Sequence, residues 1–174
     1  QGSKYLYPLL AVNNVFGGGM SSSLFQKIRE EKGFVYSIFS YPSSYRNAGM
    51  FTIYAGMNPK HMKNVIKLIM EEINTIVENG LDGDTLAKSK EQLKGGYILG
   101  LESTSSRMNS IGKAELLLGR IYTPEKILSL IDEIEIDTVK KVIKEVFNTG
   151  AMSITAVGNI NSNTDLKAIA NNYS

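Results

Sequence analysis

Hydrophobic residues follow two different spacings in the first half of this chain. From residue 62 to residue 77 they recur every three or four positions, which predicts an amphipathic helix ending at Asn79-Gly80. Residues 34–45 are rich in aromatic and β-branched side chains, and over 49–57 Phe51, Ile53 and Ala55 alternate with less apolar residues. These two stretches predict an antiparallel hairpin with a turn over residues 46–49.

The rest of the chain predicts further helices and one more strand. Helices are expected near residues 4–15, 84–102 and 105–118, after Pro124, and after a cap at Asp137. Gly95, Gly96 and Gly100 lie in the helix over 84–102 and suggest close packing there. The apolar stretch 151–158 predicts a strand at the centre of the sheet. This order favours an α+β fold, a mainly antiparallel sheet with helices packed on one face.

Composition limits the partners and the chemistry. A chain of 174 residues with 43% hydrophobic content fits a single domain with one sizeable core. The net charge is only +2 and charges of both signs interleave, so neither nucleic acid nor a membrane is an expected partner. The absence of cysteine excludes disulfides and thiolate metal sites. We expect a cytoplasmic location, although a chain without cysteine fits either side of a membrane.

Complete hydrolytic machinery is missing from this sequence. A catalytic zinc site needs about three protein ligands, usually histidines and a carboxylate. The chain has one histidine, His61, and neither His-x-x-Glu-His nor His-Glu-x-x-His occurs. A serine triad would also need His61 as its only base. We therefore expect no metal ligands in this chain and treat His61 as an ordinary side chain.

Candidate chemistry is concentrated between residues 16 and 37. Ser23 and Gln26 form a capping-box pattern that predicts a short helix, which Gly33 would end, followed by a strand. Arg29 then lies near the helix end and Tyr36 near the strand start. A tyrosine phenol can donate a hydrogen bond to a developing oxyanion, and a guanidinium can hold carbonyls or a carboxylate. Alternatively, Tyr36 is a half-buried strand residue, and Arg29 is a cation at the helix end that the helix dipole favours.

The glycines Gly17, Gly18 and Gly19 precede this helix and leave several roles open. A glycine loop at a helix N-terminus can bind phosphate, but neither nucleotide-binding pattern fits the residues around it. A structural turn into the helix is another role.

Aromatic side chains recur along the predicted hairpin. Phe39, Tyr41, Tyr45 and Tyr54 are expected in the core or in cross-strand packing.

The run from Phe16 to Ser37 resembles the C-terminal domain of the inverted-zincin zinc metallopeptidases of the M16 family. The likeness rests on the glycine loop, on Ser-Ser-x-Leu-Phe and on Arg-Glu-x-x-Gly-x-x-Tyr-Ser. Segments 92–96 and 101–108 are similar to the family's later Leu-Lys-Gly and Leu-Glu-Ser-x-x-Ser-Arg motifs, so the resemblance covers nearly the whole chain. It implies a LuxS-like α+β domain over residues 1–174, cut before a first strand.

The resemblance also implies a shared active site. Arg29 and Tyr36 would reach into the zinc site of an N-terminal catalytic domain or subunit, and Gly17, Gly18 and Gly19 would help to bind a peptide or protein substrate. Zinc and its ligands would lie in that missing domain or partner, so this chain alone should be inactive in peptide hydrolysis. A non-catalytic scaffold or substrate-gripping homologue is the alternative. Loss of the large partner should also expose an apolar patch that could drive dimers.

Overall fold

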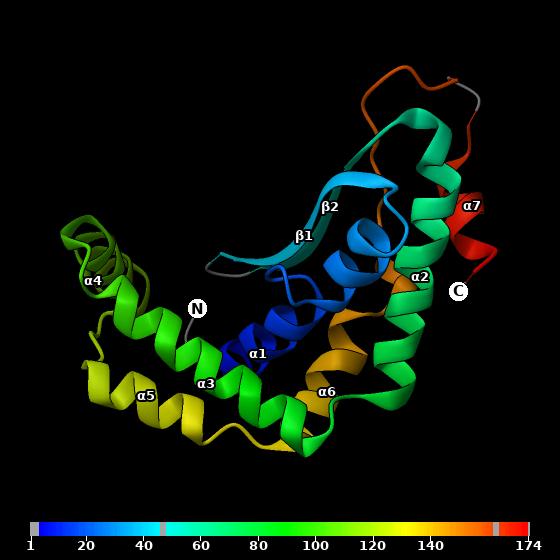
Figure 1. Cartoon of the computed structure of the whole chain (residues 1–174). Coiled ribbons are helices and arrows are strands. Elements are labelled where there is room, and N and C mark those ends of the chain that lie inside the picture. The colour runs from blue at the N-terminus through cyan, green and yellow to red at the C-terminus, as the bar shows by residue number, and fades with distance from the viewer. Residues whose placement is uncertain (1–3, 46–47, 162–163, 174) are drawn as a thin grey trace.

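The computed structural model describes residues 4–45, 48–161 and 164–173, and within them the chain is α+β, as predicted (Figure 1). Part of the predicted turn, residues 46–47, falls outside these ranges. The elements are α1 (Leu6–Phe16), the π-helix η1 (Phe25–Glu30), β1 (Val35–Ser44), β2 (Gly49–Met57), the 3-10 helix η2 (Pro59–His61), α2 (Met62–Asn79), α3 (Gly83–Gly100), α4 (Thr104–Leu118), α5 (Pro124–Asp132), α6 (Ile136–Val146), the 3-10 helix η3 (Thr149–Ala151) and α7 (Leu166–Asn171).

Helix α1 runs through the middle of the core. Its residues Ala11, Val12 and Phe16 are fully buried. The Phe16 ring lies 4.8 Å from that of Phe147, at the end of α6, and 6.1 Å from that of Phe51 on β2, measured between ring centroids. The three rings therefore join α1, the hairpin and α6 by burial and tilted aromatic packing.

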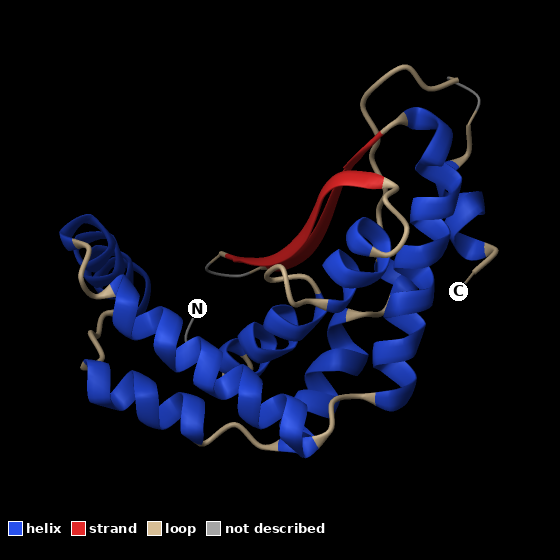
Figure 2. Ribbon diagram, viewed as in Figure 1, coloured by secondary structure: helices blue, strands red, loops and turns tan. Residues whose placement is uncertain are grey.

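The two strands pair antiparallel, as predicted. Phe39 pairs with Tyr54 and Ile38 with Ala55. Ile38 is buried, and Phe51, Ile53 and Ala55 pack against the core, so one face of the hairpin is apolar as the alternation predicts. Helices lie on that side of the two strands (Figure 2).

The prediction of a strand over residues 151–158 is wrong. Residues 149–151 form η3, the segment that follows is irregular, and β1 and β2 make the only sheet in the described ranges. A groove of about 760 Å³ is lined by Phe51, Thr52 and Ile53 of β2 and by Ala151, Met152 and Ser153. The start of the segment and β2 lie on this groove, and in the described ranges β2 is paired with β1 alone.

Two local expectations also need correction. Beside Gly95, Gly96 and Gly100 an added Cβ would meet no other atom within 4 Å, so these glycines do not mark close packing. Asp137 does not cap α6, because the helix begins at Ile136 and Asp137 lies in its first turn.

Helix α4 stands apart from the core. None of its residues is buried, and Leu116 is 86% exposed. Figure 1 shows α4 beyond the end of α3, away from the hairpin. Its sequence is weakly amphipathic, so no single face drives it onto the core.

The loop after α1 approaches β1 very closely at Gly17. The Ser40 backbone N–H donates to the Gly17 carbonyl at 2.8 Å. A Cβ at Gly17 would lie 2.8 Å from that same Ser40 nitrogen, whereas a Cβ at Gly19 would meet nothing within 4 Å. Only glycine therefore fits at position 17.

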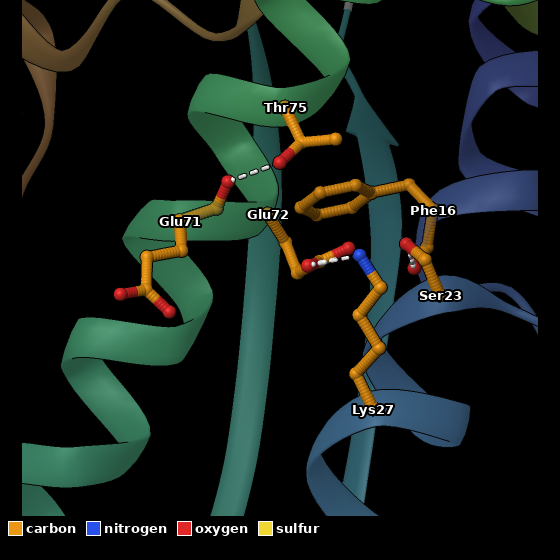
Figure 3. A network of polar contacts seen from close by, with 6 residues as sticks. All are labelled: Phe16, Ser23, Lys27, Glu71, Glu72 and Thr75. Atoms are coloured by element: carbon orange, nitrogen blue, oxygen red, sulfur yellow. Dashed lines mark hydrogen bonds and ion pairs between the residues drawn. The ribbon is translucent and has the colours of Figure 1, made fainter.

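An ion pair links η1 to α2. Lys27 Nζ lies 2.6 Å from Glu72 Oε1, and the Glu72 side chain is only 8% exposed. Figure 3 shows the two side chains reaching toward one another from their helices. A carboxylate buried to this degree needs a partner, because leaving it unpaired costs its desolvation free energy.

We expect Gly17→Ala to lower the free energy of unfolding by about 1–3 kcal/mol, the usual cost of overpacking. Urea unfolding of Gly17→Ala and Gly19→Ala measures this. Gly19→Ala is the matched control and should leave the midpoint unchanged or slightly higher. Equal midpoints for the two variants would contradict the close approach.

We expect Lys27→Met to lower the free energy of unfolding by about 1–3 kcal/mol, because the buried Glu72 carboxylate loses its partner. The control is Lys67→Met on α2, whose partner Glu71 lies 3.7 Å away and is 47% exposed. That exposed pair should contribute less than about 1 kcal/mol. Urea unfolding of both variants compares the buried ion pair with the exposed one. Equal losses of unfolding free energy would contradict a stabilising role for the buried pair.

Candidate functional site

Tyr36 occupies a β-bulge at the start of the hairpin. Val35 pairs with Met57 and Ser37 with the adjacent Gly56, which leaves Tyr36 as the extra residue. Val35 and Ile38 are both buried, and Tyr36 between them is 74% exposed. Regular alternation would have placed Tyr36 on the same face as Ile38, so the bulge turns the phenol outward. The half-buried alternative for Tyr36 is wrong.

Arg29 lies in the last turn of η1 and is exposed. Its guanidinium carbon sits 4.8 Å from the centre of the Phe25 ring, which holds the side chain by a cation–π contact. No described carboxylate forms an ion pair with it, so its donors remain available to a ligand. The π-helix itself is an uncommon element that occurs frequently at functional sites.

A tight turn joins the helix of Arg29 to the strand of Tyr36. Gly33 has a φ of 62°. Its N–H donates to the Arg29 carbonyl at 3.0 Å, and the Phe34 N–H donates to the Ile28 carbonyl at 3.2 Å. The bond from Gly33 is that of an αL helix end, and the bond from Phe34 reaches one residue further back than in a Schellman motif, so Gly33 ends the helix as predicted.

The predicted capping box is wrong. No side chain caps η1. The Ser23 hydroxyl donates to the Phe16 carbonyl at 3.3 Å, and the Gln26 amide donates to the Met20 carbonyl at 2.7 Å. Both side chains instead satisfy the carbonyl groups that flank the glycine loop, because a close loop leaves those acceptors without backbone donors.

The three glycines are not equivalent. Gly17 packs on Ser40, and a Cβ at Gly18 would lie 2.9 Å from the Asn13 carbonyl oxygen. Gly19 has open space beside it. Packing therefore explains the first two glycines, whereas a side chain at Gly19 would meet no neighbour.

The site does not complete a hydrolase within the described part of the chain. There, no group of three or more His, Cys, Asp or Glu residues could hold a metal ion. The His61 ring stacks on Phe34 with 4.8 Å between centroids, a packing role. Zinc therefore has no fitting ligand set among these residues. A phenol and a guanidinium remain, and both can donate hydrogen bonds.

Sequence reasoning missed the bulge and the π-helix. One signal for the bulge was present: the inward apolar residues Val35 and Ile38 are three positions apart, where a regular strand needs an even spacing. The π-helix left no comparable signal.

No helix in the described ranges is long and apolar enough to cross a membrane.

Comparison with known proteins identifies the family. A family model described as "Peptidase M16 inactive domain" matches residues 1–93. An uncharacterized zinc protease of Bacillus subtilis, YmxG, is 41% identical over 146 residues, which are 84% of this chain and 36% of that protein. The chain thus spans about a third of the length of this relative.

Two solved structures have the same fold. A conserved protein from Enterococcus faecalis superposes with a TM-score of 0.68 at 26% identity, covering 82% of this chain and 33% of its own. A peptidase M16 inactive domain from Pseudomonas fluorescens superposes with a TM-score of 0.73 at 19% identity. The match covers 84% of this chain and 35% of the Pseudomonas chain. Sequence, family model and fold agree, and the chain belongs to the M16 peptidase family, as its inactive domain.

Proposed function

We propose that this chain is the substrate-binding and transition-state-assisting half of a zinc metalloendopeptidase and is inactive alone. The observation that carries the proposal is the bulge that turns Tyr36 to solvent. A tyrosine with a purely packing role would gain nothing from this reorientation, since burial of its ring would stabilise the fold more.

Tyr36 and Arg29 would act on the peptide carbonyl and its neighbours. Negative charge grows on the carbonyl oxygen when water adds to a peptide bond, and a positioned phenol donates a hydrogen bond to that oxygen. The guanidinium of Arg29, held against Phe25, donates through its planar fork to substrate carbonyls or to a carboxylate. Both groups act as donors, and neither needs to change its protonation state.

The zinc ligands and the general base would come from an N-terminal catalytic domain or subunit. Support comes from the relatives, which are named zinc proteases and are about three times as long as the matched segment. Substrate contact at the glycine loop is proposed mainly for Gly19, where there is space. A first strand ahead of α1, a cytoplasmic location and a dimer stay predictions.

Tyr36→Phe should lower kcat/KM for peptide hydrolysis by about 100-fold or more, because one oxyanion donor is lost. The assay uses this chain together with its zinc-binding region and a quenched fluorescent peptide. The variant should unfold like the wild type, since the phenol is exposed.

Two results would overturn the proposal. Unchanged kcat/KM in Tyr36→Phe would remove the catalytic role. No hydrolysis by a complex whose partner binds zinc would favour the scaffold alternative.

Arg29→Lys should lower kcat/KM by about tenfold, because the lysine keeps the charge but loses the bidentate fork. Arg120→Lys is the matched control, since Arg120 also stacks on a ring, that of Tyr122 at 5.0 Å, but on the segment after α4. The same assay measures both variants. Equal effects at the two positions would show that the fork of Arg29 has no special role.

A further inference from the structure

The outer face of the hairpin carries exposed aromatic rings. Phe39 and Tyr41 are each 42% exposed and Tyr54 is 49% exposed, on the side of the strands away from the core. Tyr36 joins them at the bulged end, three residues before Phe39. Of the four rings expected in the core or in cross-strand packing, Phe39 and Tyr54 do pack across the strands, while Tyr41 contacts Phe39 on its own strand and Tyr45 is exposed. Phe39, Tyr41 and Tyr54 are called the aromatic face below.

The aromatic face is ordered before anything binds. Phe39 and Tyr54 are direct partners across the hairpin, and their rings stack with 5.0 Å between centroids and 25° between planes. The centroid of the Tyr41 ring lies 6.0 Å from that of the Phe39 ring. A Cβ at Gly56 would lie 3.4 Å from the Tyr54 hydroxyl oxygen, so the ring extends across this glycine. Rings held in this way lose little rotamer freedom on binding.

The two strands that carry the aromatic face are uncharged. Neither β1 nor β2 contains a single Asp, Glu, Lys or Arg in its described sequence. Exposed apolar rings on a neutral surface favour a neutral apolar ligand, because a charged ligand would lose hydration without gaining an ion pair. Phosphate-bearing ligands and acidic or basic segments are therefore poor matches.

We propose that the aromatic face binds an uncharged, extended stretch of the peptide substrate and selects an apolar or aromatic side chain near the bond to be cut. The inference rests on the proposed function, since Tyr36 places that bond at the end of the face. Three residues separate Tyr36 from Phe39, and an extended peptide advances at the same rate as a strand, about 3.3 Å per residue. The selected side chain thus lies about three residues from the bond.

A single fluorescent reporter can test this binding directly. The chain contains no tryptophan, so Phe39→Trp in the 174-residue chain gives one emission signal from the aromatic face. The probes are two ten-residue peptides with blocked termini: one is uncharged and has a central Phe, and the other has a single central Asp in the same otherwise uncharged sequence. The Phe peptide should shift the emission saturably and bind about tenfold more tightly than the Asp peptide.

Further variants separate recognition from folding. Tyr54→Ser in the Phe39→Trp background should weaken the Phe peptide about tenfold, and Tyr54→Phe should retain its affinity. Leu116→Trp places the reporter on exposed α4 and should show no response. Circular dichroism and thermal unfolding verify that each variant is folded.

Three results would overturn the inference: no emission change in a folded Phe39→Trp chain, equal affinity for the two peptides, or an emission change that follows protein concentration instead of peptide. The last would mean that a second copy covers the face. Binding without any effect of Tyr36→Phe on hydrolysis would retain this inference while overturning the proposed function. Loss of hydrolysis in Tyr36→Phe without peptide binding at the aromatic face would retain the proposed function and overturn this inference.

Discussion

The candidate site depends on the close approach of the Gly17 backbone to Ser40 of β1. This contact fixes the chain at the end of α1, so the glycine loop, η1 and the start of β1 follow from one anchored point. The approach is possible only without a side chain, and it places a backbone carbonyl where the Ser40 N–H can reach it. A side chain at Gly17 would push against Ser40 at the point from which the loop leads into η1.

After this contact, an ion pair, a turn and a β-bulge set the direction of the side chains. The buried Glu72 pairs with Lys27 and links η1 to α2, the left-handed turn at Gly33 reverses the chain, and the bulge rotates Tyr36 outward. None of these devices is a hydrophobic contact, yet each works only because α1 and the hairpin are already packed. The fold supplies rigidity, and the polar and backbone contacts supply orientation.

The elements with a clear periodicity could be predicted from sequence. Helix α2 and the hairpin have apolar positions that match a single period, and the motifs around Arg29 and Tyr36 identified the family. The missing strand after η3 could not be predicted, because an apolar stretch forms a strand only beside a partner edge. The capping box failed because Ser23 and Gln26 found nearer acceptors in the loop. Exposure of Tyr54 follows from its alternation with the inward Phe51, Ile53 and Ala55, and exposure of Phe39 follows only once the register pairs it with Tyr54.

Helix α4 has thermodynamic consequences that differ from those of the rest of the chain. With no buried residue to tie it to α1, its 15 residues rely on backbone hydrogen bonds and propensity, which leave a helix of this length marginal in water. Its amide hydrogens must therefore exchange with solvent through local opening, while those of α1 wait for global unfolding. Hydrogen exchange in α4 thus measures how strongly any neighbouring domain or molecule packs against it.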